Sequence, residues 1–208
     1  MVTLIIPAYN EAENIERVLD VVVPMSDFQQ IIVVDDGSTD ATYATIKKYP
    51  VDVVRHDTNR GKGAAIWTGL QATRTPYLML LDADLIGLQP SHLRSLLRPV
   101  LEDGADMSIG LFGVGRFATD WAQRVAPHLT GQRVMRRDVI TELPLIEQTR
   151  YGLEVALTRH VRRQGYRMSE VFLDDLTHRM KEEKLGYVRG VQARMRMYWD
   201  ILRVLMRR

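Results

Sequence analysis

The chain has 208 residues, of which 46% are hydrophobic and 26% charged, and its formal net charge is +2. This length suits one well-buried domain rather than two, and the composition is that of a soluble globular protein. The absence of cysteine excludes disulfides and thiolate metal sites, so a reducing, cytoplasmic location is expected. No basic leader opens the sequence and no run of about 18 apolar residues follows, so neither a signal peptide nor a membrane span is expected.

Strand and helix patterns alternate along the chain. Apolar runs predict strands over 2–6, 31–34, 51–54, 77–81, 107–111 and 168–173. Amphipathic spacing predicts helices over 15–22, 38–48, 61–73, 93–101, 119–125 and 152–163. Continuous apolar strands separated by such helices are typical of a parallel sheet covered on both faces. We therefore expect an α/β fold with a mostly parallel central sheet.

The last segment predicts a basic amphipathic helix. Apolar residues recur at three-and-four spacing over 188–208, with arginines between them. Residues 179–208 carry a formal charge of +6, so the other 178 residues carry −4. Two interpretations stay open. The helix packs on the catalytic domain or on a second copy, as in a homodimer, or it lies on an anionic membrane surface at the periphery of the inner membrane.

Two carboxylates, Asp82 and Asp84, follow the apolar run 77–81 directly. In open α/β sheets, ligands collect at the carboxyl ends of the strands. Carboxylate oxygens there suit a hard divalent cation, Mg²⁺ or Mn²⁺, which binds through one or two carboxylates and a substrate phosphate. Taken alone, the same short pattern also fits an acidic turn.

Three further polar blocks fall at this edge of the expected sheet. Residues 7–11 follow the first strand, residues 35–40 follow the second, and 59–64 contain Lys62 between two glycines. Backbone N–H groups, carboxylates and a lysine near a helix start can hold a nucleoside diphosphate. Neither a P-loop nor a Gly-x-Gly-x-x-Gly dinucleotide fingerprint is present.

In this order, Pro-Ala-Tyr-Asn-Glu, Val-Asp-Asp-Gly-Ser-Thr-Asp, Asn-Arg-Gly-Lys-Gly and Asp-Ala-Asp resemble the family 2 glycosyltransferases of the GT-A fold, over residues 2 to about 110. The resemblance implies a nucleotide-sugar donor, with uracil favoured over guanine as its base, and a divalent metal held by Asp82 and Asp84. The substrate-binding residues that it implies in this half are Pro7, Ala8, Tyr9, Glu11, Asp36, Lys62, Asp82 and Ala83.

The second half resembles the family more loosely. Residues 129–137 are similar to the loop before the acceptor site of polyprenyl-phosphate and phosphoglycerate sugar transferases, and 151–154 to a segment of glucosyl-3-phosphoglycerate synthase-like enzymes. Guanidinium groups suit phosphate oxygens, so Arg133 and Arg136 are predicted to bind an anionic acceptor or the diphosphate. A solvated basic loop is the alternative. The acceptor is expected to be a lipid phosphate or a small anionic molecule.

Glu154 and Asp175 are the candidate catalytic bases for an acceptor hydroxyl. Glu154 opens a helix pattern, where a carboxylate also stabilises the first turn, and Asp175 follows a late strand, where a plain turn is the alternative. His178 is the predicted third metal ligand, because the resemblance places a histidine in this region and neutral imidazole binds divalent transition metals. An exposed histidine without a role is its alternative.

The expected organisation is one catalytic domain over 1–178, with a donor half (1–110) and an acceptor half (111–178), followed by the basic helix. A sugar-nucleotide-forming nucleotidyltransferase would need a glycine-rich basic loop after the first strand, which this chain lacks. A non-catalytic nucleotide-sugar-binding module is disfavoured by the intact metal residues. Nucleic acid is not expected as a partner, because the basic tail lacks interleaved aromatic residues for base stacking.

Overall fold

The computed structural model describes residues 1–112, 130–143, 146 and 152–178, of which 177 and 178 are described by their backbone. The predicted helices over 119–125 and 188–208 lie outside these residues. In the described part of the chain, no helix is both long and apolar enough to cross a bilayer.

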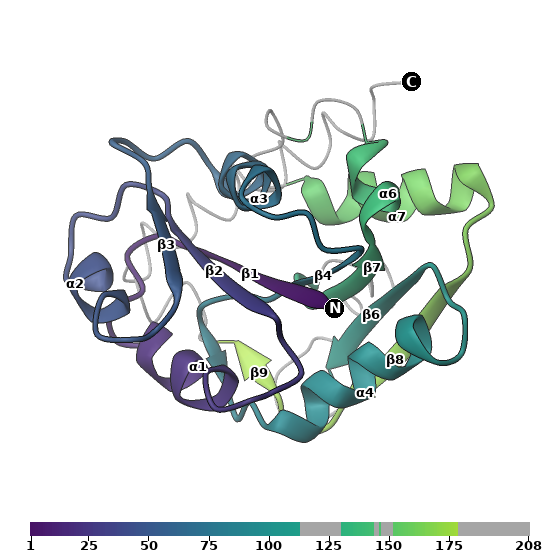
Figure 1. Cartoon of the computed structure of the whole chain (residues 1–208), viewed down its shortest axis with the longest axis horizontal. Helices are drawn as coiled ribbons and strands as arrows, with labels where there is room; N and C mark the ends of the chain where they lie inside the picture. The colour runs from purple at the N-terminus through teal and green to yellow at the C-terminus, as the bar shows by residue number, and fades with distance from the viewer. Residues whose placement is uncertain (113–129, 144–145, 147–151, 179–208) are drawn as a thin grey trace, which may run out of the picture.

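A seven-stranded sheet forms the centre of the molecule, with strand order β3-β2-β1-β4-β7-β6-β8 (Figure 1). Strand β7 runs antiparallel to both of its neighbours, and the other adjacent pairs are parallel. The expected mostly parallel sheet is therefore confirmed. Its strands are β1 (Val2–Ala8), β2 (Gln30–Asp35), β3 (Asp52–Arg55), β4 (Tyr77–Leu80), β6 (Met107–Phe112), β7 (Arg133–Arg136) and β8 (Met168–Leu173).

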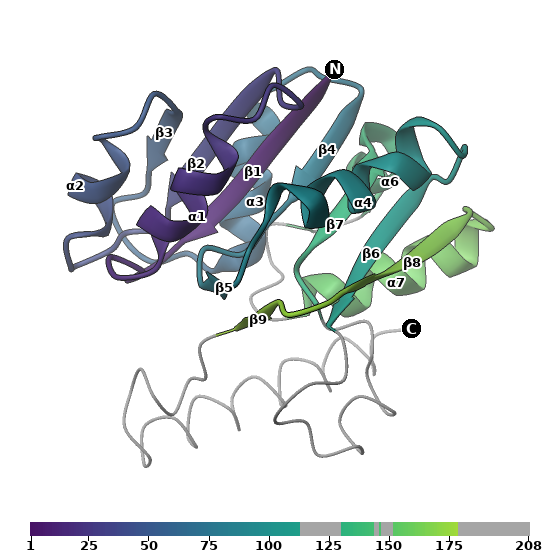
Figure 2. The ribbon, with the colours of Figure 1, turned by 90° about the horizontal axis from the view of Figure 1, so that it is seen from below.

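Helices cover both faces of the sheet (Figures 1 and 2). One face carries α3 (Lys62–Gln71), α6 (Arg137–Thr141) and α7 (Leu153–Gln164), and the other carries α1 (Ile15–Val22) and α4 (Pro90–Leu101). The short helix α2 (Thr42–Ile46) lies beside α1. Alternation along β1 explains the two layers, because Ile5 packs with the α3 side while Leu4 and Ile6 pack with the α1 side.

Strand β7 corrects one prediction from the sequence. Residues 129–137 were expected to form a loop, but 133–136 form a strand between β4 and β6. Its two central residues, Val134 and Met135, are fully buried. Two apolar residues between arginines are too short a run to show periodicity, and the ladders on both sides decide the conformation.

A small second sheet lies near the carboxyl ends of the parallel strands β1, β2 and β4. It pairs β5 (Leu85–Ile86) antiparallel with β9 (Thr177–His178), with Leu85 opposite His178. Because β1, β2 and β4 are parallel, the loops that follow them meet at one edge of the large sheet, and β5 begins at the same edge. The candidate site is built there.

Candidate active site

The loops after β1 and β2 are tied to each other by hydrogen bonds. The backbone N–H of Asn10 donates to Ser38 Oγ (2.9 Å), and that of Glu11 donates to Thr42 Oγ1 (2.8 Å). In return, the N–H of Thr39 donates to Asn10 Oδ1 (2.9 Å). The two polar blocks predicted to line a nucleoside therefore form one continuous wall.

Asp36 holds the glycine-containing loop against this wall. Its carboxylate accepts the N–H groups of Arg60 (2.9 Å) and Gly61 (2.7 Å), and His56 Nδ1 lies 2.7 Å from Oδ1. Both Asp36 and His56 are buried. No role was predicted for His56. Its contact with Asp36 helps to fix the carboxylate that accepts the N–H groups of the loop, and its Nε2 lies 2.9 Å from Thr68 Oγ1.

Lys62 joins two of the predicted site carboxylates. It is the first residue of α3, and its Nζ lies 2.6 Å from Asp82 Oδ1 and 2.5 Å from Glu154 Oε1. The lysine side chain is 26% exposed, so the cluster is open to a ligand. Burial alone would lower the pKa of Lys62, but the charges of Asp82 and Glu154 outweigh it and raise that pKa above its ordinary value. The ammonium group is therefore charged when a ligand arrives.

Asp82 is also held from the side of β7. Gln132 is fully buried, and its Nε2 donates to Asp82 Oδ2 (3.0 Å). A Cβ on Gly131 would stand only 2.6 Å from Asp82 Cγ, so the carboxylate can lie here only because residue 131 has no side chain. No role was predicted for Gly131 or Gln132 from the sequence. The one sequence feature that could have indicated them is a glycine followed by a polar residue directly before Arg133.

Arg133 lies behind the cluster rather than on the surface. It is fully buried, and its guanidinium donates to the Thr130 carbonyl (3.2 Å) and to Thr158 Oγ1 (3.0 Å). Burial lowers the pKa of Arg133 to about 10, while the Glu154 and Asp82 carboxylates oppose that shift. Since Thr158 in turn donates to the Glu154 carbonyl (2.9 Å), Arg133 braces the first turn of α7.

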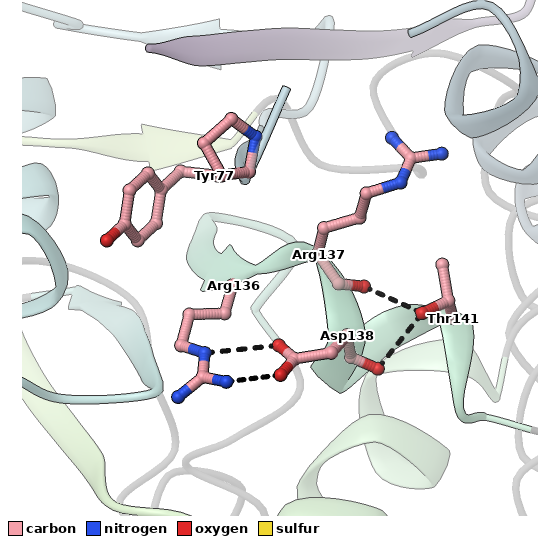
Figure 3. Close-up of a pocket in the computed structure, with 6 residues that line it drawn as sticks. Tyr77, Arg136, Arg137, Asp138 and Thr141 are labelled. Atoms are coloured by element: carbon pink, nitrogen blue, oxygen red, sulfur yellow. Dashed lines mark hydrogen bonds and ion pairs between the residues drawn. The ribbon is translucent and has the colours of Figure 1, made fainter. Parts of the chain in front are cut away.

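Arg136 is not brought to this cluster. Arg136 pairs with Tyr77 at the beginning of β4, whereas Arg133 pairs with Leu80 at the end of that strand. The two arginines therefore lie at opposite ends of the parallel strands, and only Arg133 is at the carboxyl end. The Arg136 guanidinium binds the carboxylates of Asp138 and Asp106. It lines a separate pocket of about 380 Å³ with Pro76, Tyr77, Arg137, Asp138 and Thr141 (Figure 3).

The residues suited to a metal fall where β5 begins. Asp84 immediately precedes β5, and the β5–β9 ladder sets the backbone of His178 opposite Leu85, one residue from Asp84. Among the described side chains, no three histidine, aspartate or glutamate residues form a closed metal site. The backbone arrangement nevertheless brings Asp84 and His178 near each other from segments about 90 residues apart. Carboxylate oxygens suit Mg²⁺ and Mn²⁺, and imidazole binds divalent transition metals, of which Mn²⁺ is one.

The remaining predicted residues lie around the same edge. Ala8 and Ala83 are buried, Pro7 and Glu11 are half-buried, and Tyr9 is 43% exposed. Asp175 is exposed in the turn between β8 and β9, in the left-handed conformation (φ 59°). Its placement fits a turn residue, while Glu154 is buried within the charged cluster.

Comparison with known proteins gives a family match over most of the chain. The model of "Glycosyl transferase family 2" matches residues 3–172. A dolichol-phosphate mannosyltransferase of Pyrococcus furiosus is 33% identical over 116 residues, which cover 52% of this chain and 32% of that protein. A glucosyl-3-phosphoglycerate synthase of Mycolicibacterium smegmatis is 31% identical over 191 residues, which cover 75% of this chain and 62% of that protein. The chain thus matches less than two thirds of the length of these curated relatives.

Solved structures match nearly the whole chain. The glucosyl-3-phosphoglycerate synthase of Mycobacterium tuberculosis, crystallised with Mn²⁺, UDP-glucose and phosphoglyceric acid, has a TM-score of 0.79 and 26% sequence identity. The match covers 98% of this chain and 79% of that chain. The same enzyme crystallised with Mg²⁺ and UDP has a TM-score of 0.80. These matches confirm the GT-A architecture expected from the sequence.

Proposed function

Because the chain belongs to glycosyl transferase family 2, we propose that it is a metal-dependent glycosyltransferase that moves a sugar from a UDP-sugar, with UDP-glucose the first choice. One observation carries this proposal. Lys62, Asp82 and Glu154 come from three separate segments and meet at the carboxyl edge of the sheet, beside Asp84 and β9. Lys62 Nζ lies 2.6 Å from Asp82 Oδ1 and 2.5 Å from Glu154 Oε1. A charged, partly open cluster at this edge is where open α/β sheets bind their ligands.

The nucleoside of the donor would lie against the wall formed by the loops after β1 and β2. Pro7, Ala8, Tyr9 and Glu11 would line it from one side and Asp36 from the other, with backbone groups of the tied loops meeting its oxygens. The diphosphate would then reach Lys62, whose Nζ is charged and near the beginning of α3, where the helix dipole also favours negative charge. Asp82 and Ala83 would contact the donor from the end of β4.

A bound Mg²⁺ or Mn²⁺ would stabilise the negative charge that develops on the departing nucleoside diphosphate. Asp84 and His178 are the residues proposed to hold it, with Asp82 beside them. The structural relative was crystallised with UDP-glucose and Mn²⁺ and with UDP and Mg²⁺, which supports this choice of metal and of uracil as the nucleobase.

The acceptor is proposed to be a small phosphorylated acid rather than a lipid phosphate. The phosphoglycerate enzymes align over 75% of this chain, whereas the dolichol-phosphate enzyme aligns over 52%. Glu154 would accept the proton of the acceptor hydroxyl, because it is already oriented by Lys62 and lies in the cluster that meets the donor. Asp175 is the second candidate for this base.

A thermal-shift panel of nucleotide sugars, each with and without Mn²⁺, tests the proposal. A ligand at 100 times its Kd stabilises the native state by about 2.7 kcal/mol, which for a chain of this size raises Tm by about 5–10 °C. We expect this rise for UDP-glucose with Mn²⁺ and a much smaller one without the metal. Equal, negligible shifts for every UDP-sugar in both conditions would contradict the assignment.

Product analysis separates the rival functions. Incubation with UDP-glucose, Mn²⁺ and 3-phosphoglycerate is expected to release UDP and form a glucosylated acid. Formation of UDP-glucose from glucose 1-phosphate and UTP would instead identify a nucleotidyltransferase. Tight donor binding with no turnover on either phosphoglycerate or a polyprenyl phosphate would favour a non-catalytic binding module.

A further inference from the structure

Gln132 is an unusual residue for the interior of a sheet. It lies just before β7, its side chain is fully buried, and its backbone carbonyl accepts the N–H of Gly110 on β6 (2.9 Å). The absence of a side chain at Gly110 makes room for it, since a Cβ there would stand 3.2 Å from the Gln132 Cβ. Packing alone would be served as well by an apolar side chain of the same size.

The direction of the Gln132 amide follows from its neighbour. The side-chain NH₂ group donates to Asp82 Oδ2, because the opposite orientation would set a carbonyl oxygen against a carboxylate. This leaves Gln132 Oε1 buried without a hydrogen-bond partner among the described residues. A buried acceptor without a partner destabilises the fold, so stability does not explain why a glutamine stands here.

Asp82 is therefore held from both sides. Lys62 Nζ meets Oδ1 at 2.6 Å and Gln132 Nε2 meets Oδ2 at 3.0 Å, while Gly131 lets the backbone of this segment approach the carboxylate closely. Two donors on different oxygens fix both the position and the plane of a carboxylate. Removing one of these donors would weaken the restraint on rotation about the Asp82 side-chain bonds.

We propose that Gln132 is a positioning residue, which acts through Asp82 and sets the orientation of that carboxylate for the metal–diphosphate part of the donor. This inference rests on the proposed function, and it adds a residue from the acceptor half of the chain to the donor site. In this proposal Gln132 acts on the donor only through the Asp82 carboxylate.

The test compares Gln132→Met, which keeps the size of the side chain and removes its donor, with Ser108→Ala. Ser108 is a matched control, because it is equally buried on the adjacent strand β6 and also donates one hydrogen bond, to the Leu96 carbonyl (2.6 Å). Calorimetry would measure the affinity for UDP with and without Mn²⁺, and the affinity for uridine.

For Gln132→Met we expect the Mn²⁺-dependent gain in UDP affinity to fall about tenfold, the worth of one charge-assisted hydrogen bond. Uridine affinity should stay within about twofold of the wild type, since the nucleoside wall is untouched. Ser108→Ala should lower Tm and leave both affinities unchanged. A full Mn²⁺-dependent gain in Gln132→Met, or a parallel loss of uridine affinity, would overturn the inference.

A crystal structure of metal-free Gln132→Met tests the same inference without any ligand. The Asp82 carboxylate is expected to rotate away from its wild-type plane while Lys62 still contacts one oxygen. An unchanged carboxylate would overturn the positioning role, whatever the protein transfers. Conversely, a rotated carboxylate in a protein whose wild type binds no UDP would support the positioning role and refute the proposed function.

Discussion

Gly131→Ala is expected to lower the activity of the protein by about 10²-fold without unfolding it. The added Cβ would stand 2.6 Å from Asp82 Cγ, while carbon atoms in ordinary contact are about 3.5–4.0 Å apart. The carboxylate must therefore move by about 1 Å, away from Lys62 and Gln132. Since a misplacement of about 1 Å in a site can cost about 10²-fold in rate, kcat/KM should fall by about that factor.

A second glycine provides the control. Gly165 follows α7 with φ 73°, and nothing lies within 4 Å of the position where its Cβ would stand. Gly165→Ala should therefore cost about 1–2 kcal/mol of stability through backbone strain and leave kcat/KM unchanged. The assay is release of UDP from UDP-glucose with Mn²⁺, with Tm measured for both variants. A Gly131→Ala protein with wild-type kcat/KM, or equal losses of activity in both variants, would refute the argument from Asp82 geometry.

Three further variants test the charged groups. Lys62→Met leaves Asp82 and Glu154 without their shared cation, which should cost about 3 kcal/mol and lower Tm by about 6–12 °C in a thermal melt. Arg133→Met should cost a similar amount by urea titration, because two hydrogen-bond acceptors lose their buried donor; unchanged midpoints would contradict both expectations. Burial raises the pKa of Asp40, but hydrogen bonds donated by Thr42 and by the Ala12 N–H outweigh it and hold that pKa below its usual value. The stabilisation by the Asp40 carboxylate is therefore present above about pH 4 and is lost as the pH falls further. Asp40→Asn should flatten the dependence of Tm on pH below about 4, and an unchanged slope would argue against this.

The first half of the molecule could be predicted from sequence because its signals are local. Strands of four or more apolar residues, such as the run before Asp82, carry their own periodicity, and the polar blocks follow strands whose parallel order brings their ends together. The cluster of Lys62, Asp82 and Glu154 was predicted residue by residue, although not as a single bridge. Strands from both sides of residue 110 contribute to one sheet, so the fold itself marks no boundary there. The division into a donor half and an acceptor half near residue 110 therefore stays a prediction.

The parts that could not be predicted depend on contacts between distant segments. Arg133 and Arg136 look equivalent in sequence, but the antiparallel register of β7 buries one behind the cluster and carries the other to the opposite edge. The role proposed for Gln132 likewise depends on the strands beside it and not on a local pattern. No local pattern distinguishes these residues, because a four-residue strand in the middle of a sheet is defined by its neighbours.

The balance of charge supports the proposed dependence of donor binding on a metal ion. Lys62 and Arg133 carry two positive charges, which match the two negative charges of Asp82 and Glu154, so the described core of the site is formally neutral. Asp84 adds a further carboxylate at this edge, and a diphosphate would add about two negative charges. Repulsion at this partly buried edge opposes donor binding until a dication offsets it. The dependence of UDP affinity on Mn²⁺ should consequently weaken in Asp84→Asn, whose metal-free affinity should rise above that of the wild type. Calorimetry that found a lower metal-free affinity in that variant would contradict this account.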